Sequence, residues 1–145
     1  MKLSVNQCPD VTETEITITC NAVTPELQAL IDRLRALDLT LSGKKDDAWY
    51  RVPVEKILYI DSADGRTFLY CANGVFESKN RLFELEEQLK NRMFLRISKN
   101  TIVNLHALRH ARPLELAKME LLLKNGEKLI VTRHYLNSFK ASFGI

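Results

Sequence analysis

Short apolar segments separated by tight-turn signals constrain the fold of this chain more than any other feature. The pairs Asp64-Gly65, Asn73-Gly74 and Asn125-Gly126 each lie between two segments of strand length. Asn-Gly and Asp-Gly pairs favour hairpin turns, because the turn types that match the twist of paired strands need positive φ. A chain with this spacing predicts a mostly β fold, α+β overall, in which short antiparallel strands form stacked sheets beside brief helices.

The strands are expected where apolar residues alternate with polar ones or form short runs. They fall at residues 15–20, 39–42, 49–52, 57–61, 67–71, 75–78, 116–123 and 128–131. Two short helices are expected later in the chain, one capped by Asn80 and one capped by Thr132. Asp64 belongs to a turn rather than to a pair of catalytic carboxylates with Asp61, because it directly precedes Gly65.

An earlier helix begins at Thr24, whose hydroxyl caps it, with Pro25 in the first helical position. It carries a one-sided apolar stripe at helical spacing, made of Leu27, Leu30, Ile31, Leu34 and Leu37. Two interpretations stay open. The stripe packs against the chain's own strands, or it forms a homodimer with a second copy.

The chain has 145 residues, about the size of one domain, and 46% of them are hydrophobic. We expect a strand-strand-helix extension over residues 1–47 and a second unit over residues 48–145. No apolar run approaches the roughly 20 residues of a membrane span, and the N-terminus is too polar for a secretory signal. The expectation is a cytoplasmic protein that is not embedded in a membrane.

Sequence motifs of enzymes and metal sites are missing. There is no glycine-rich nucleotide loop, no H-E-x-x-H and no G-x-S-x-G, so we predict no catalytic residues, no cofactor and no enzyme activity. Cys8, Cys20 and Cys71 are odd in number and lack C-x-x-C spacing, which favours free thiols. His106 and His110 are four residues apart but have no third ligand nearby, so no metal is predicted.

Positive charge is concentrated in the last part of the chain. Residues 92–145 hold ten lysines and arginines and three acidic residues, a net charge of +7, whereas the whole chain is +3. All three histidines also lie there, and we expect them to face solvent or a bound nucleic acid. Such asymmetry favours a polyanionic partner.

Within the basic segment, Ser98, Lys99 and Asn100 form a polar tip between two apolar pairs. These side chains suit a nucleic acid, because they offer a phosphate donor, a cation for guanine acceptors and a bidentate amide. Arg133 opens a predicted helix, where the helix dipole disfavours a cation unless an anionic ligand is bound. An ordinary solvated loop and a tolerated surface arginine are the plainer alternatives.

From about residue 53 onward the sequence resembles the LytTR family of bacterial DNA-binding domains. The matching pieces, in the family's order and spacing, are residues 57–62 (ILYIDS), the leucine-spaced helix of residues 81–89, residues 94–104 (FLRISKNTIVN), and Asn125-Gly126 leading to residues 131–133 (VTR). The resemblance covers about 90 of the 145 residues. It implies a LytTR-like fold of stacked short sheets, preceded by a small extension.

The resemblance also implies a sequence-specific regulator of transcription that inserts loops into successive major grooves of double-stranded promoter or operator DNA. Base contacts would come from Lys99 and Arg133, with a third from Arg66 and Thr67. Arg96 and Ser98 would serve phosphates, and Asn104 would have a structural role, closing the loop through its amide. Asn100 and His134, which adjoin Lys99 and Arg133, complete the predicted DNA-binding residues.

Many family members carry a receiver domain, and the roughly 50 residues before this domain are too few for one. We therefore expect a standalone regulator. What switches it stays open among dimerisation through the extension, a regulatory partner such as a membrane protein, and control of its own abundance. A protein-interaction or RNA-binding module on the same scaffold is the alternative. RNA readers expose aromatic residues for stacking, whereas Tyr59, Phe68, Phe94 and Phe139 sit in apolar patterns typical of a core.

Overall fold

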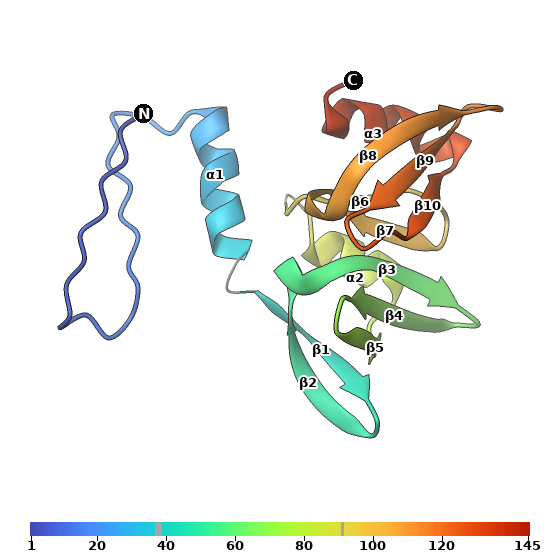
Figure 1. Ribbon diagram of the computed structural model, residues 1–145, viewed down its shortest axis with the longest axis horizontal. Helices are drawn as coiled ribbons and strands as arrows, with labels where there is room; N and C mark the ends of the chain where they lie inside the picture. Colours follow the sequence, from blue (N-terminus) through green and yellow to red (C-terminus); the bar gives the residue numbers. More distant parts are fainter. Residues whose placement is uncertain (37–38, 91) are drawn as a thin grey trace.

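Two antiparallel sheets and three short helices make up the computed structural model, which describes residues 1–36, 39–90 and 92–145 (Figure 1). The larger sheet has seven strands in the order β2-β1-β5-β4-β3-β7-β6, and the smaller has the order β10-β9-β8. Both the mostly β class and the short helices were predicted correctly. Leu37, the last residue of the predicted apolar stripe, lies outside the described residues.

The larger sheet consists of β1 (Thr40–Lys45), β2 (Ala48–Pro53), β3 (Ile57–Ala63), β4 (Arg66–Cys71), β5 (Gly74–Ser78), β6 (Phe94–Arg96) and β7 (Thr101–Asn104). The smaller sheet consists of β8 (Leu108–Leu114), β9 (Lys118–Leu123) and β10 (Lys128–Val131). The α-helices are α1 (Pro25–Ala36), α2 (Leu82–Gln88) and α3 (Leu136–Phe143). Single 3-10 turns lie at η1 (Val54–Lys56), η2 (Leu105–Ala107) and η3 (Arg133–Tyr135).

Tight turns join consecutive strands, as the sequence predicted. Asp64 and Gly65 have φ values of 53° and 75° and join β3 to β4 in a two-residue turn. The next hairpin is also present, but its turn is shifted by one residue. Cys71 pairs with Gly74, so Ala72 and Asn73 make the turn and Gly74 begins β5.

Gly43 is required where β1 crosses β5. A Cβ atom built on Gly43 would lie 2.6 Å from Cβ of Phe76, closer than real Cβ atoms approach one another. Glycine in a strand commonly marks such a close approach. Its small size therefore lets the β1–β2 hairpin join the larger sheet.

The predicted strand at residues 15–20 is wrong. Residues 1–24 contain neither helix nor strand, and their side chains are exposed. A strand needs a hydrogen-bonding neighbour, and the alternating pattern finds none within this chain. The extension is thus an irregular segment followed by α1. Because Lys45 pairs with Ala48 inside one hairpin, residues 40–47 belong to the larger sheet. The division of the chain at residue 47 stays a prediction.

Of the three predicted helix caps, only the one at Thr24 forms its capping hydrogen bond. At α1, the N–H of Leu27 donates to Oγ1 of Thr24 over 3.2 Å, which confirms the cap. Asn80 does not cap α2, because the residue before that helix is Arg81, whose N–H donates to Oε1 of Glu84 over 3.0 Å. Thr132 occupies the predicted position, but its hydroxyl makes no capping hydrogen bond.

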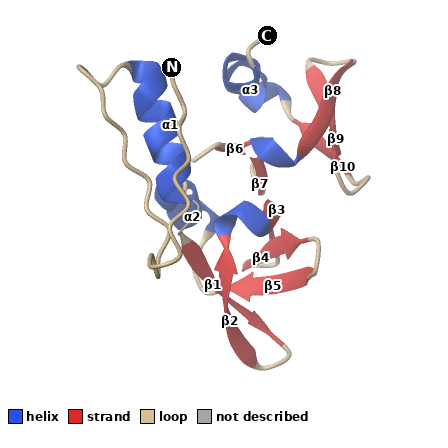
Figure 2. Cartoon of the chain, turned by 60° about the vertical axis from the view of Figure 1, so that its left-hand side comes forward, coloured by secondary structure: helices blue, strands red, loops and turns tan. Residues whose placement is uncertain are grey.

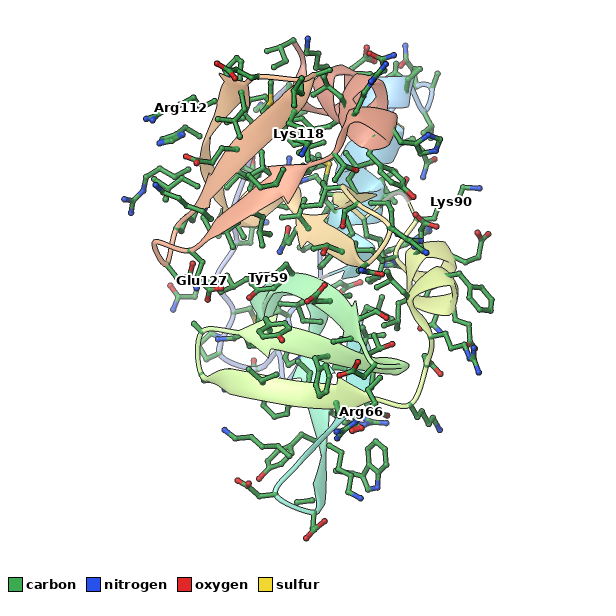
Figure 3. All side chains as sticks on the ribbon, turned by 90° about the vertical axis from the view of Figure 1, so that its right-hand side faces the viewer. Tyr59, Arg66, Lys90, Arg112, Lys118 and Glu127 are labelled. Atoms are coloured by element: carbon green, nitrogen blue, oxygen red, sulfur yellow. The ribbon has the colours of Figure 1, made fainter. Side chains whose placement is uncertain are left out.

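Two hydrophobic clusters stabilise the sheets. One lies between the larger sheet and α2, and the other joins β3 and β7 to the smaller sheet and α3. Tyr59 connects the two layers, because its ring stacks on Tyr70 with centroids 4.4 Å apart and its hydroxyl donates to Oε2 of Glu127 over 2.7 Å (Figure 3). Burial and this hydrogen bond raise the pKa of Tyr59 well above its usual value.

Of the helices in the described part of the chain, none combines the length and the apolar character that crossing a bilayer requires.

Candidate nucleic-acid interface

The polar tip predicted at Ser98, Lys99 and Asn100 is the loop between β6 and β7. Ile97, which is completely buried, anchors it, and the N–H of Ile97 donates to the carbonyl of Thr101 over 3.0 Å. Oγ of Ser98 accepts from the N–H of Asn100 at 3.3 Å. Lys99 and Asn100 are exposed, whereas Ser98 is half-buried. The loop therefore presents two polar side chains from a closed turn.

A second set of hydrogen bonds fixes this loop to the end of β3. The N–H of Ser62 donates to the carbonyl of Asn100 over 2.9 Å, and the hydroxyl of Thr101 donates to Oδ1 of Asp61 over 2.9 Å. Hydrogen bonds to a charged group are worth about 1.5–3 kcal/mol, more than those between neutral groups. Asp61 therefore positions the loop, a role that sequence reasoning missed.

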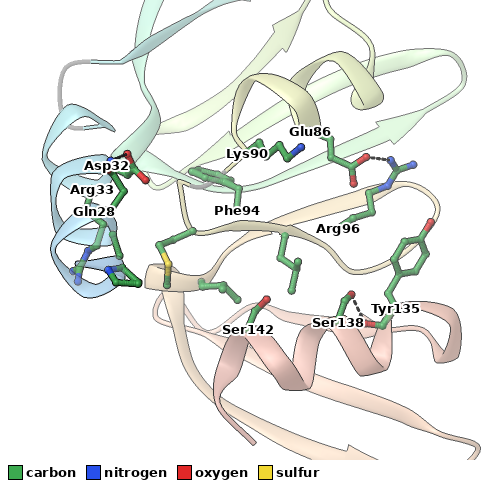
Figure 4. A pocket seen from close by; sticks show the side chains of 15 residues that line it. Gln28, Asp32, Arg33, Glu86, Lys90, Phe94, Arg96, Tyr135, Ser138 and Ser142 are labelled. Atoms are coloured by element: carbon green, nitrogen blue, oxygen red, sulfur yellow. Dashed lines mark hydrogen bonds and ion pairs between the residues drawn. The ribbon is translucent and has the colours of Figure 1, made fainter. Parts of the chain in front are cut away.

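Arg96 uses its guanidinium on the loop itself. Its Nε donates to the carbonyl of Ser98 over 2.9 Å, and its Nη2 donates to the carbonyl of Lys99. Its Nη1 lies 3.3 Å from Oε1 of Glu86 on α2 (Figure 4). The side chain is only 18% exposed. Arg96 was expected to hold a phosphate. In the free protein its N–H donors instead contact the backbone carbonyls of the loop and the carboxylate of Glu86.

Thr132 joins the loop to the start of η3. Its N–H and its hydroxyl both donate to the carbonyl of Ile97, over 2.9 Å and 3.3 Å. Arg133 and His134 follow directly and are exposed, and the His134 ring stands edge-on to Tyr135. The predicted residues of the loop and of η3 are therefore held together through one buried residue, Ile97.

Arg66 lies at the same end of the larger sheet. It pairs with Ala63 in the β3–β4 register, one residue beyond Ser62, whose N–H contacts the loop. Its Nη2 lies 2.6 Å from Oε1 of Glu77, and this hydrogen bond lowers the pKa of Glu77. Figure 3 shows Arg66 at the end of its strand. Thr67 is only 5% exposed, so the free protein does not present its side chain.

Asn104 is buried and hydrogen-bonded, but its amide does not close the β6–β7 loop as expected. Its Nδ2 donates to the carbonyl of Ile57 over 2.9 Å, and its Oδ1 accepts from the N–H of His106 at 3.0 Å. Since the side chain is 4% exposed, these bonds satisfy a buried amide that joins β7 to the start of β3.

No cluster of three histidine, cysteine or acidic residues with metal-binding geometry occurs within residues 1–36, 39–90 and 92–145. His106 lies in η2 and His110 in β8. Cys71 is buried, and burial raises the pKa of its thiol to about 11, so the thiolate is scarce at neutral pH.

Comparison with known proteins adds independent findings. Residues 47–144 match the family described as the LytTr DNA-binding domain. A solved structure titled "LytTr DNA-binding domain of putative methyl-accepting/DNA response regulator from Bacillus cereus" is 26% identical with a TM-score of 0.70, covering 73% of this chain and 97% of that one.

Two curated relatives come from Staphylococcus aureus. An uncharacterised HTH-type transcriptional regulator of strain N315 is 29% identical over 147 residues, which cover 100% of this chain and 99% of the relative. The transcriptional regulatory protein LytR of strain bovine RF122 / ET3-1 is 24% identical over 127 residues, which cover 88% of this chain. The match spans about half of LytR, 49% of its length.

Proposed function

The chain belongs to the LytTr family of DNA-binding transcriptional regulators, and on that premise we propose that it recognises a specific sequence of double-stranded DNA through two adjoining surface elements. These elements are the β6–β7 loop and the start of η3. The observation that carries the proposal is their shared anchor, because Thr132 donates two hydrogen bonds to the carbonyl of Ile97. An anchor of this kind fixes the spacing of side chains that read neighbouring bases.

Lys99 and Arg133 are the proposed base readers. Both are exposed, and lysine and arginine suit the O6 and N7 acceptors that guanine presents in the major groove. Ser98, Asn100 and His134 flank them and would contact phosphates or base edges. Because the loop and η3 share one anchor, they would enter the same stretch of major groove on this proposal, and insertion into a successive groove would require another loop.

On this proposal Arg96 positions the loop and does not contact DNA directly, since its N–H donors already bond to the carbonyls of the loop. Arg66 supplies a further contact once DNA competes with Glu77 for its guanidinium. An exposed ion pair of this kind is worth little, about 0–1 kcal/mol, so exchanging the carboxylate for a phosphate costs little. Thr67 then supports the strand from its buried position rather than contacting a base.

Net charge supports a polyanionic partner. Residues 48–145 carry sixteen lysines and arginines and ten acidic residues, a net charge of +6, whereas residues 1–47 have a net charge of −3. DNA binding that neutralises phosphates releases counterions, so affinity falls steeply as salt rises. The uneven charge supports DNA binding by residues 48–145 rather than by the extension.

An RNA-binding module is less well supported. Phe139 and Tyr59 are buried and Phe94 packs against a hydrophobic cluster, so these rings are not available for base stacking. The exposed aromatic rings, Trp49, Tyr50, Phe83 and Phe143, lie outside the β6–β7 loop and η3. We expect duplex DNA from the gene's own upstream region to compete far better than single-stranded RNA of equal length.

Salt-dependent binding to that duplex tests the proposal. We expect specific affinity to fall by orders of magnitude when salt rises several-fold, and sequence selection to recover a defined motif. A flat salt response, or equal competition by RNA, contradicts the proposal. Arg35→Ala provides a charge control, because Arg35 is an exposed cation on α1 outside the proposed interface.

A further inference from the structure

Exposed large hydrophobic residues are more frequent in the first 23 residues than in the rest of the described chain. They contain seven exposed large hydrophobic residues: Met1, Leu3, Val5, Val11, Ile16, Ile18 and Val23. Leu3 is 88% exposed and Ile16 is 63% exposed. Single exposed apolar residues are normal, but a concentration like this marks an interaction site.

The backbone of the same segment is extended and almost unpaired. Two runs, residues 1–8 and 15–22, extend in opposite directions near α1 and are separated from each other over much of their length (Figures 1 and 2). Within residues 1–23, the hydrogen bond from the N–H of Val11 to the carbonyl of Cys8 is the one backbone pair. The remaining donors and acceptors are free to pair with another strand.

Side-chain alternation gives each run one apolar face. Leu3 and Val5 occupy odd positions in the first run, and Ile16 and Ile18 occupy even positions in the second. Suppose that the two runs form an antiparallel hairpin with its turn within residues 9–14 and with Val5 opposite Ile18. Each odd-numbered residue of the first run then lies opposite an even-numbered residue of the second. All four side chains then share one face of the hairpin.

Such a hairpin is not stable alone. Two strands without further packing are marginal in water, and a third strand or a helix against the apolar face is needed. The nearest helix is α1, whose Leu27, Leu30, Ile31 and Leu34 are only half-buried. Both elements of the extension therefore keep apolar surface exposed within one chain.

Contacts between α1 and the DNA-binding domain are sparse. Among the described residues, no hydrogen bond or ion pair joins α1 to residues 39–145. An open groove of about 910 Å³ separates α1 from α2, β6 and α3, and Gln28, Asp32 and Arg33 line it on the helix side (Figure 4). Leu30 and Leu34 of α1 line a smaller cavity of about 370 Å³ with Val54 and Phe94, whereas Leu27 and Ile31 line neither cavity. The body of the protein therefore covers only part of the apolar stripe of α1.

Charge identifies the kind of partner. The extension is acidic, with a net charge of −3 over residues 1–47, so nucleic acid is disfavoured. The runs of residues 1–8 and 15–20 contain one lysine and one glutamate, Lys2 and Glu15. The extended runs of two copies thus carry balanced charge, and the two other acidic residues of the first 23, Asp10 and Glu13, lie in the turn region between the runs.

We propose that residues 1–23 of two copies pair into one intermolecular four-stranded sheet, whose apolar face covers the α1 helices of both chains. The interface is isologous, so each copy offers the same hairpin edge and the same helix stripe. Pairing supplies the hydrogen-bonding neighbour that residues 15–20 lack in one chain. Two DNA-binding domains then face two half-sites, a consequence that rests on the proposed function.

Sedimentation of the full chain from sub-micromolar to tens of micromolar concentration tests the proposal. We expect a dimer, and we expect Ile16→Lys with Ile18→Lys to convert it to a monomer. Val11→Lys is the matched control, because Val11 is also apolar and 55% exposed but lies in the turn region. A wild-type monomer at every concentration, or a dimer that survives the double substitution, overturns the proposal.

Thiol reactivity of the unsubstituted chain gives a second measurement. Cys20 shares the face of Ile16 and Ile18, whereas Cys8 alternates to the face opposite Leu3 and Val5. Both thiols are exposed in one chain. We expect Cys20 to become protected as concentration rises while Cys8 stays reactive, with Cys8→Ser and Cys20→Ser assigning the two signals. Equal reactivity at all concentrations contradicts the intermolecular sheet.

DNA titrations distinguish dimerisation through residues 1–23 from sequence-specific DNA binding. The monomeric double variant should keep its affinity for a single half-site and lose the gain that a paired site provides. If the chain dimerises but binds no duplex, the sheet is supported and the proposed function fails. If it binds a half-site yet never dimerises, the sheet fails and the proposed function stands.

Discussion

Lys99 and Arg133 are exposed side chains at the ends of a rigid arrangement of hydrogen bonds. We predict that Lys99→Ala and Arg133→Ala each relax base preference at particular operator positions, by about 1–3 kcal/mol of discrimination, because one major-groove pair reports one base. Stability should stay within about 0.5 kcal/mol of wild type, as expected for surface positions. Binding-site selection with each variant beside the parent measures this, and an unchanged motif contradicts the assignment.

Arg96 combines three contacts in one guanidinium, two to loop carbonyls and one to Glu86. We predict that Arg96→Ala weakens binding to all sequences alike and lowers the free energy of unfolding by about 1–3 kcal/mol, because carbonyls lose a charged donor. Arg96→Lys should rescue little, since an ammonium lacks the planar fork. Titrations with specific and random duplexes, together with urea unfolding, measure both effects.

A purely phosphate-binding role for Arg96 gives a different result. In that case Arg96→Ala leaves unfolding unchanged, and Arg96→Lys retains most of the affinity. Arg35→Ala on α1 again provides the control for loss of one positive charge.

At the scale of elements, the β6–β7 loop and η3 act as one unit because Thr132 contacts Ile97. We predict that Thr132→Val removes the 3.3 Å hydroxyl bond and costs about 0.5–1.5 kcal/mol of stability, while the backbone bond from its N–H remains. DNA affinity should fall more than in a matched variant of equal stability elsewhere, because the spacing of Lys99 and Arg133 loosens.

Gly43→Ala offers a comparison variant whose loss of stability is at least as large. Its Cβ would meet Cβ of Phe76 at 2.6 Å, and overpacking of this kind costs about 1–3 kcal/mol. The β1–β5 crossing is remote from the loop in the strand order, so we predict lower stability with unchanged half-site affinity under native conditions. Urea unfolding and DNA titration decide this, and equal loss of affinity in Gly43→Ala and Thr132→Val contradicts the coupling of loop and η3.

At the scale of the whole molecule, we predict that His106 contributes a small pH dependence of stability. Its side chain is exposed, but partial burial, and then the positive charges of Arg33 and Lys124, lower its pKa below the usual 6.5. The unfolded chain therefore binds the proton more readily, so this contribution to stability is complete above pH 6.5 and is lost as pH falls through the lower folded-state pKa. We predict that acidification destabilises the wild type.

Replacing His106 measures how much this imidazole contributes to the pH dependence of stability. His106→Gln should flatten the stability profile just below pH 6.5 without altering the more acidic region, where carboxylates such as Glu77 titrate. Thermal unfolding across that range measures it. A profile identical to that of wild type places the proton uptake on another group.

The sequence by itself determined the hairpins, the mostly β class and the family. Turn residues such as Asp64 and Gly65 act on immediate neighbours, so their effect is readable from adjacent positions. The polar tip at Ser98, Lys99 and Asn100 was found because apolar pairs flank it. The β8 strand was missed, since Arg109, Arg112 and Pro113 interrupt its apolar pattern.

Only the tertiary structure decided which predicted residues are free to act. From the sequence, Arg96 was predicted to be free to bind a phosphate. In the folded chain its guanidinium contacts the carbonyls of its own loop and the carboxylate of Glu86. Thr132 was predicted to cap a helix, but its hydroxyl donates to the carbonyl of Ile97, 35 residues away in the sequence. The alternation at residues 15–20 is typical of a strand, but a strand also needs a hydrogen-bonding neighbour. Local pattern sets a preference, and contacts between distant residues decide whether it is realised.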